Sequence, residues 1–281
     1  MRVKVVTDSS IYLDEKTVKE LDITIVPLIV NLGKESYAEL DLDYREFFAQ
    51  LPSLKVLPTT SQPSLQDIYQ SFCRLTEEGN AVLAIFISSS LSGTYNTALL
   101  TRRMILEKYP EARIEVVDSR AACMGFMVLA AAKAAQEGAG LEEVLHIAVE
   151  KAQRSHFLFV PASLDYLAKG GRIGEAAALI GTMLNIKPVL ALQGGQVIVK
   201  EKVRTLDKAF GKILEIMEAD LRSKGLLEAG VGHVNNPQLA ALWAKHIEKE
   251  IKLPVVIREI GPVLGLHLGP GTLGVGYSTA K

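Results

Sequence analysis

Cysteine, excess charge and long apolar runs are what this sequence has least of. Its two cysteines, Cys73 and Cys123, have no metal-ligand spacing, and we interpret them as buried thiols in helices. A net charge of −1 and the absence of a basic stripe argue against nucleic acid as a partner. No apolar run reaches the roughly 20 residues of a membrane span, and the first residues do not resemble a signal peptide. We therefore expect a cytoplasmic protein without an integral membrane segment.

Motifs of familiar catalytic chemistry are also missing. Residues 269–274 match the G-x-G-x-x-G pattern, but only seven residues follow them, too few for the helix and distant acidic residue of a dinucleotide site. The five histidines show no metal-ligand spacing, so we expect neither a metal nor a cofactor. Ser92 does not lie in a nucleophile elbow. A small-molecule hydrolase or transferase using Ser92 or His267 nevertheless stays open at this point.

The most informative stretch that is present covers residues 81–100. Residues 81–87 are an uninterrupted apolar run, as in a strand buried on both faces of a parallel sheet. Four serines and a glycine follow within residues 88–93, and a helical pattern begins at Thr94. Such a loop places hydroxyl groups at the positive end of a helix, where anions bind. The same residues can equally serve as a helix cap, and the local sequence leaves both interpretations open.

The two halves of the chain have different patterns. In the first half, β-rich runs alternate with helical segments, which predicts a parallel sheet with helices on both faces. One of these runs, residues 23–30, carries Pro27 and is expected to be irregular, and residues 58–63 are expected to form a loop between two prolines. The second half opens with a strand at 157–160.

Further elements of the second half indicate a mixed sheet. A hairpin is predicted at 189–200 with a diglycine turn at 194–195, and a small-residue helix at 176–184. We therefore predict an α/β protein of two domains. Residues 1–155 would form an α/β/α domain with a parallel sheet, and residues 156–281 a two-layer α+β domain with a mixed sheet.

Seven short motifs, in order along nearly the whole chain, together resemble one family. They are VVTDSS near the start, TTSQPS at 59–64, ISSSLSGTY at 87–95, VVDS at 116–119, LAKGGRIG at 167–174, NIKP at 185–188 and GLHLGPG at 265–271. The combination is similar to the DegV family of bacterial fatty-acid-binding proteins. The resemblance implies a fold similar to part of dihydroxyacetone kinase, with a long-chain fatty acid such as palmitate held between the two domains.

The resemblance also implies a site for the carboxylate of the fatty acid. Thr60 and Ser92 match the positions that bind this head group in the family. Ser61 and Gly93 are their neighbours in the same two loops, and we include them in the site. His267 matches a histidine near the carboxylate. This assignment favours a ligand site over simple capping at residues 88–93.

A partner is implied as well. Arg172 matches a basic residue that faces a kinase subunit in characterised members of the family. Those members hold the acyl chain while the separate fatty acid kinase phosphorylates the carboxyl group, so the resemblance implies a carrier and not an enzyme. Lys202 and Arg204 follow the hairpin at alternating positions. If the strand continues, their side chains share one face and would extend a partner-facing basic patch.

Overall fold

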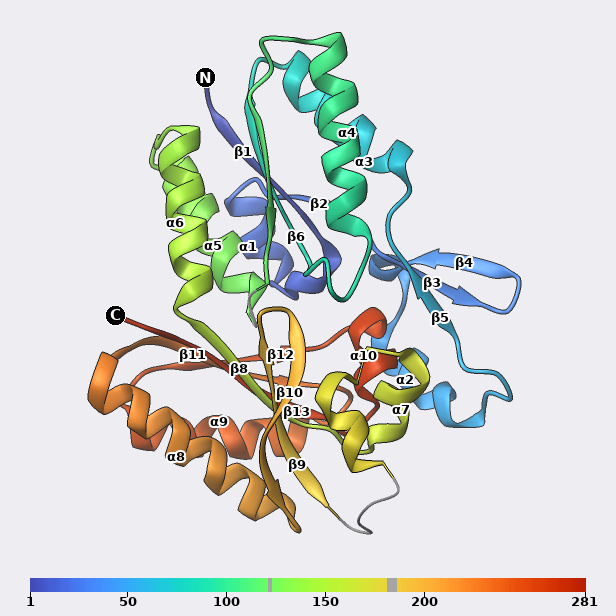
Figure 1. Cartoon of the computed structure of the whole chain (residues 1–281), viewed down its shortest axis with the longest axis vertical. Helices are drawn as coiled ribbons and strands as arrows, with labels where there is room; N and C mark the ends of the chain where they lie inside the picture. Colours follow the sequence, from blue (N-terminus) through green and yellow to red (C-terminus); the bar gives the residue numbers. More distant parts are fainter. Residues whose placement is uncertain (121–122, 181–185) are drawn as a thin grey trace.

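The computed structural model describes residues 1–120, 123–180 and 186–281 and shows two lobes, one above the other (Figure 1). The upper lobe contains a parallel sheet in the order β2-β1-β6-β7. Its strands are β1 (Val3–Asp8), β2 (Thr24–Val26), β6 (Ala81–Phe86) and β7 (Ile114–Asp118). Every residue of β6 is buried, as its apolar run predicts.

Helices cover both faces of this parallel sheet. On one face α5 (Met124–Gln136) and α6 (Leu141–Gln153) share a core with Val5 and Leu83. On the other, α3 (Leu65–Glu77) and α4 (Thr94–Lys108) pack against Val6 and Val82. The alternation of side chains along each strand supplies apolar groups to both cores. The predicted three-layer α/β/α arrangement is confirmed.

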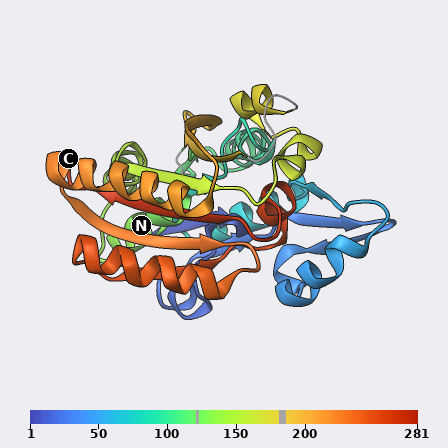
Figure 2. The ribbon, with the colours of Figure 1, turned by 90° about the horizontal axis from the view of Figure 1, so that it is seen from below.

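The lower lobe contains a mixed sheet in the order β10-β9-β8-β13-β11-β12, in which β11 and β12 are parallel and the other pairs are antiparallel. The strands are β8 (Ser155–Val160), β9 (Lys187–Gln193), β10 (Gln196–Val203), β11 (Leu226–His233), β12 (Val255–Glu259) and β13 (Leu273–Thr279). Helices α8 (Leu206–Lys224) and α9 (Pro237–Ile251) cover one face, as Figure 2 shows from below. This is the predicted two-layer lobe, and the opposite face of the sheet looks toward the upper lobe.

The predicted hairpin is present, and its turn contacts the other lobe. Gly194 and Gly195 have φ values of 58° and 84°, as a tight turn between β9 and β10 requires. A side chain at Gly195 would overlap the hydroxyl group of Ser88. The turn therefore lies directly against the serine-rich loop that follows β6.

A small third sheet was not predicted. It has the order β4-β3-β5, with β3 (Ile29–Leu32), β4 (Glu35–Ala38) and β5 (Thr59–Ser61), and extends to one side of the molecule (Figure 2). The irregularity expected at Pro27 is present, but residues 23–30 are not one strand: they are divided into β2 and β3, which belong to different sheets. The loop expected at 58–63 is corrected too, since β5 pairs with β3 and satisfies its backbone groups there.

Shorter elements complete the fold. They are the helices α1 (Glu15–Glu20), α2 (Tyr44–Gln50), α7 (Leu164–Gly170) and α10 (Pro262–Leu268), and the 3₁₀ helices Ser9–Ile11, Glu39–Asp41, Leu51–Ser53 and Gly174–Leu179. The α-helix expected at 176–184 is corrected where it is described, because residues up to 179 form 3₁₀ turns with bonds such as Ile180 N–H to Ala177 O. Its remainder at 181–184, residue 185 of the NIKP motif, and residues 121–122 lie outside the described residues.

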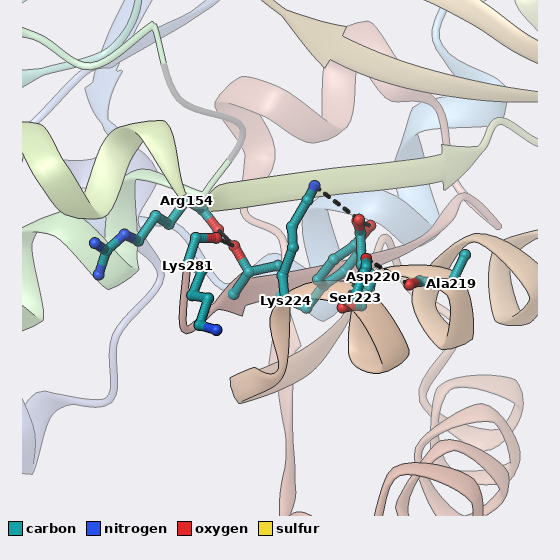
Figure 3. Close-up of polar contacts among 8 residues, drawn as sticks. Arg154, Ala219, Asp220, Ser223, Lys224 and Lys281 are labelled. Carbon is teal, nitrogen blue, oxygen red and sulfur yellow. Dashed lines mark hydrogen bonds and ion pairs between the residues drawn. The ribbon is translucent and has the colours of Figure 1, made fainter.

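The end of β13 is tied to the connection between α6 and β8. The hydroxyl group of Thr279 lies 3.5 Å from the carbonyl oxygen of Arg154 and 2.8 Å from that of Lys281. Nearby, Lys224 pairs with Asp220 at 2.8 Å in the last turn of α8 (Figure 3). The predicted domain boundary at 155/156 falls at the start of β8, and the independence of the two domains stays a prediction.

Candidate functional site

A cavity of about 570 Å³ lies between the upper lobe and the uncovered face of the mixed sheet. Most of its wall is apolar, with contributions from both lobes that include Phe126, Leu129, Phe157, Phe159 and Val197. All five residues predicted for the carboxylate line it: Thr60, Ser61, Ser92, Gly93 and His267. The structure thus brings together side chains from β5, from the loop before α4 and from α10.

Thr60 and His267 are in direct contact although they are 207 positions apart. The hydroxyl oxygen of Thr60, on β5, lies 2.8 Å from Nε2 of His267, near the end of α10. Ser92 makes a separate contact, with its Oγ 2.9 Å from Oγ1 of Thr94. Arg172 links the two contacts, because its Nε donates to the carbonyl oxygen of Leu91, next to Ser92, and its charge lies near His267. The two hydroxyl groups and the imidazole therefore belong to one polar end of the cavity, on three different elements.

His267 is held in its neutral form at this polar end. Burial and the nearby positive charge of Arg172 lower the pKa of His267 to about 4. Its Nδ1 atom is buried and has no hydrogen-bond partner in the described part of the chain. The ring packs against Gly170, where a side chain would overlap Nδ1. At neutral pH the imidazole is thus an uncharged hydrogen-bonding group.

A second close approach shapes the same end of the cavity. A side chain at Gly93 would overlap Oε1 of Gln62, whose Nε2 donates to Thr97 Oγ1 at 2.6 Å. Gly93 is therefore a packing position that brings the serine-rich loop against β5. Sequence reasoning missed Gln62, although it belongs to the TTSQPS motif.

Arg172 also lines the cavity and is exposed at its surface. Its Nη1 donates to the carbonyl oxygen of Gly170 at 2.6 Å and its Nε to that of Leu91 at 3.3 Å. The guanidinium group therefore lies between the two lobes, at the same end as His267. Its predicted role in facing a partner stays a prediction.

The other two residues of the predicted basic patch lie elsewhere. Lys202 and Arg204 are exposed and do not line the cavity. The condition for their predicted common face is not met, because β10 ends at Val203. Arg204 therefore lies beyond the strand.

A buried carboxylate that sequence reasoning missed anchors α10. Glu39 is fully buried and accepts hydrogen bonds from the hydroxyl groups of Ser9 and Tyr12 and, at 2.9 Å, from the backbone N–H of Val263. Burial raises the pKa of Glu39. Because Val263 is in the first turn of α10, Glu39 ties the helix that carries His267 to the upper lobe. Its polar local sequence contains no signal of burial.

Glycines on two neighbouring strands contribute to the cavity floor, and three of them, Gly230, Gly232 and Gly276, line the cavity. Gly230 and Gly232 on β11 pair with Gly276 and Gly274 on β13. Their neighbours in each strand, such as Val231 and Val275, point to the other face and pack under α8 and α9. A side chain at Gly274 would overlap the ring of Phe157 and one at Gly276 would overlap Cys123, so these glycines allow neighbouring side chains to pack closely against the sheet. The alternating Gly-x-Gly pattern was the available signal.

The remaining sequence predictions concern the cysteines, metals and membrane spans. Cys73 lies in α3, whereas Cys123 precedes α5; both are half-buried, and burial raises the pKa of the Cys123 thiol. No cluster of acidic, histidine or cysteine side chains in the described ranges is arranged to hold a metal ion. Within those ranges, no helix combines the length and apolarity needed to cross a bilayer.

Fold and site together define a two-lobed α/β protein whose interlobe cavity is complementary to an amphipathic molecule. The chain matches, over residues 2–280, the family described as "Uncharacterised protein, DegV family", and it belongs to that family. A DegV domain-containing protein of Clostridium perfringens is 42% identical over 280 residues, 99% of each chain.

Solved structures agree with this assignment. A fatty-acid-binding DegV family protein from Thermus thermophilus is 33% identical, with a TM-score of 0.91 over 99% of this chain and 100% of that one. A stearic-acid-binding protein from Eubacterium ventriosum is 27% identical, with a TM-score of 0.91 over 99% and 98% of the two chains. The predicted fold class and family are therefore confirmed.

Proposed function

We propose that this protein binds one long-chain fatty acid in the interlobe cavity, with the carboxylate at Thr60, Ser92 and His267. The observation that carries the proposal is the combination of a largely apolar cavity with a polar end at Thr60 and His267, beside Arg172. A volume of about 570 Å³ lies within the usual range for small-molecule sites. The fatty-acid binding described for the Thermus thermophilus and Eubacterium ventriosum proteins supports the same ligand class.

The tail would supply most of the binding free energy. Burying the chain of a ligand such as palmitate contributes on the order of 10 kcal/mol, at about 0.8 kcal/mol per methylene, before the cost of association. Each hydrogen bond to the charged carboxylate adds roughly 1.5–3 kcal/mol. The hydroxyl groups of Thr60 and Ser92 therefore set the orientation of the ligand more than its total affinity.

We also propose that the protein presents the carboxylate to a separate kinase. Arg172 is exposed and lies at the polar end of the cavity, so a partner that docks there would reach the carboxylate while the tail stays buried. Hydroxyl groups hold an anion without forming a covalent bond to it, which leaves an oxygen free to attack a phosphoryl group. On this proposal the protein is a carrier and the kinase performs the chemistry.

The contacts of Ser92 and His267 favour a carrier over a hydrolase. A serine nucleophile needs a hydrogen bond to its base. Here Oγ of Ser92 pairs with Thr94, and Nε2 of His267 pairs with Thr60. Purified protein that hydrolysed acyl esters without a partner would favour the hydrolase.

Extraction of the purified protein tests the ligand. After denaturation and transfer into organic solvent, mass spectrometry should find a long-chain fatty acid in amounts comparable to the protein. Delipidated protein should then bind added palmitate in a calorimetric titration. Background lipid alone, together with no binding of palmitate, would refute the proposed function.

A further inference from the structure

The glycine floor of the cavity ends in a row of polar side chains. The pairing of β11 with β13 runs Gly232–Gly274, then Gly230–Gly276, then Glu228–Ser278. Residues two apart on a strand lie on the same face, so Glu228 and Ser278 continue the floor in the direction away from His267. Glu228 itself lines the cavity. On these two strands, the residues of this face thus change from glycines to a carboxylate and a hydroxyl group.

The upper lobe completes this polar row. Lys151, on α6, forms an ion pair with Glu228 and donates to Oγ of Ser278 at 3.1 Å. Ser278 in turn donates to Glu228 Oε1 at 2.9 Å, and it is fully buried. The side chains of Lys151 and Glu228 are only 17% and 29% exposed. These three side chains therefore satisfy one another's hydrogen-bonding groups across the space between the lobes.

On the side of β11 and β12, the described lining of the cavity stops at this row. On β11 and on the segment leading into β12, the last lining residues are Glu228 and Pro254, and these occupy the same row. An apolar chain that extended further would have to separate the ion pair and leave buried polar groups without partners, which is unfavourable.

We infer that Glu228, held in place by Ser278 and Lys151, forms the end wall of the acyl channel and determines the longest unbranched chain that the protein accepts. This inference rests on the fatty-acid binding proposed above. The methyl end of the ligand would stop at the wall while its carboxylate stays at Thr60. The preferred ligand is then a fatty acid with an apolar, unsubstituted end.

The size of the effect follows from the geometry of the floor. Successive cross-strand pairs on one face of the sheet, such as Gly230–Gly276 and Glu228–Ser278, are two residues apart along each strand, a distance of about 6.6 Å. Tetrahedral carbon bonds of about 1.5 Å advance an extended chain by about 1.3 Å per methylene, so one row corresponds to roughly five methylenes. Removal of the Glu228 side chain frees part of a row, and we expect the length limit to rise by about two to four carbons.

The test combines Glu228→Ala with Lys151→Met, which removes both charges and leaves neither unpaired. Delipidated protein is offered an equimolar series of saturated, straight-chain, even-numbered fatty acids, and the bound species are read by native mass spectrometry. The matched control is Glu218→Ala with Arg222→Met, an exposed ion pair on α8 away from the cavity. The wall variant should accept longer chains than the wild type, and the control should not.

An unchanged length limit in a wall variant that still binds fatty acid would overturn the end wall alone. A wild type that binds none of the series would overturn the fatty-acid function and the end wall with it. If circular dichroism shows that the double variant is unfolded, Gly230→Ala tests the same geometry. Its new methyl group would lie 3.0 Å from Val256 Cγ2 in the floor, so the length limit should fall; an unchanged limit would again overturn the wall.

Discussion

The hydroxyl group of Thr60 is the most direct test of how the carboxylate would be held. Thr60→Val removes this hydroxyl but keeps the β-branched shape that suits β5. The change also takes away the partner of His267 Nε2, 2.8 Å distant. A lost hydrogen bond to a charged carboxylate costs roughly 1.5–3 kcal/mol. We therefore expect the dissociation constant for palmitate to rise about 10- to 100-fold, at about 1.4 kcal/mol per factor of ten.

The measurement is a calorimetric titration of delipidated protein at fixed pH and salt. Thr60→Ser is the matched control, because it keeps the hydroxyl group and loses only a methyl group, and it should bind close to wild-type affinity. Unfolding in urea checks that both variants are folded. Wild-type affinity in a folded Thr60→Val protein would refute the placement of the carboxylate beside β5.

Three further predictions concern the surroundings of His267. Arg172→Ala should raise the pKa of His267 from about 4 toward its ordinary value, because a nearby positive charge is lost. An NMR titration of the imidazole measures this pKa, and an unchanged value would contradict the placement of the guanidinium group. The free energy of unfolding should fall as the pH drops from about 6.5 to about 4, because His267 becomes protonated in the unfolded chain while it stays neutral in the folded protein. The loss attributable to His267 is up to about 3 kcal/mol, measured as the difference between wild type and His267→Gln in urea, and a pH-independent difference would speak against it. Glu39→Ala should lower the free energy of unfolding by about 1–3 kcal/mol, because the backbone N–H of Val263 loses its hydrogen-bond partner. The control Glu46→Ala, at an exposed position, should leave the free energy of unfolding nearly unchanged. Equal effects of the two changes would exclude a special role for Glu39.

The sequence was sufficient for the elements with strong local patterns. The buried run of β6 and the diglycine hairpin have the expected positions, because burial and turn geometry leave clear local signals. Pro27 indicated an irregularity, but the assignment of β2 and β3 to different sheets and the pairing of β5 depend on contacts with distant strands, which a local pattern does not contain.

The site could be predicted only in part for the same reason. Thr60 and His267 were singled out through the family resemblance, and nothing in their local sequence indicates that they touch. Glu39 lies in a polar stretch typical of exposed chain, yet tertiary packing buries it. The glycines of β11 and β13 were visible as an alternating pattern, but only the pairing of the two strands makes them a floor.

The contact between Thr60 and His267 joins β5 of the small third sheet to α10, two segments far apart in the sequence. A ligand that engages both residues would therefore act as a reversible cross-link between these two segments, and its binding free energy would be lost if they separated. At a free ligand concentration about 1,000 times the dissociation constant, this linkage stabilises the folded chain by about 4 kcal/mol. Lipid supply would then govern the lifetime of the protein as well as its loading, because the empty form is the one exposed to unfolding and proteolysis.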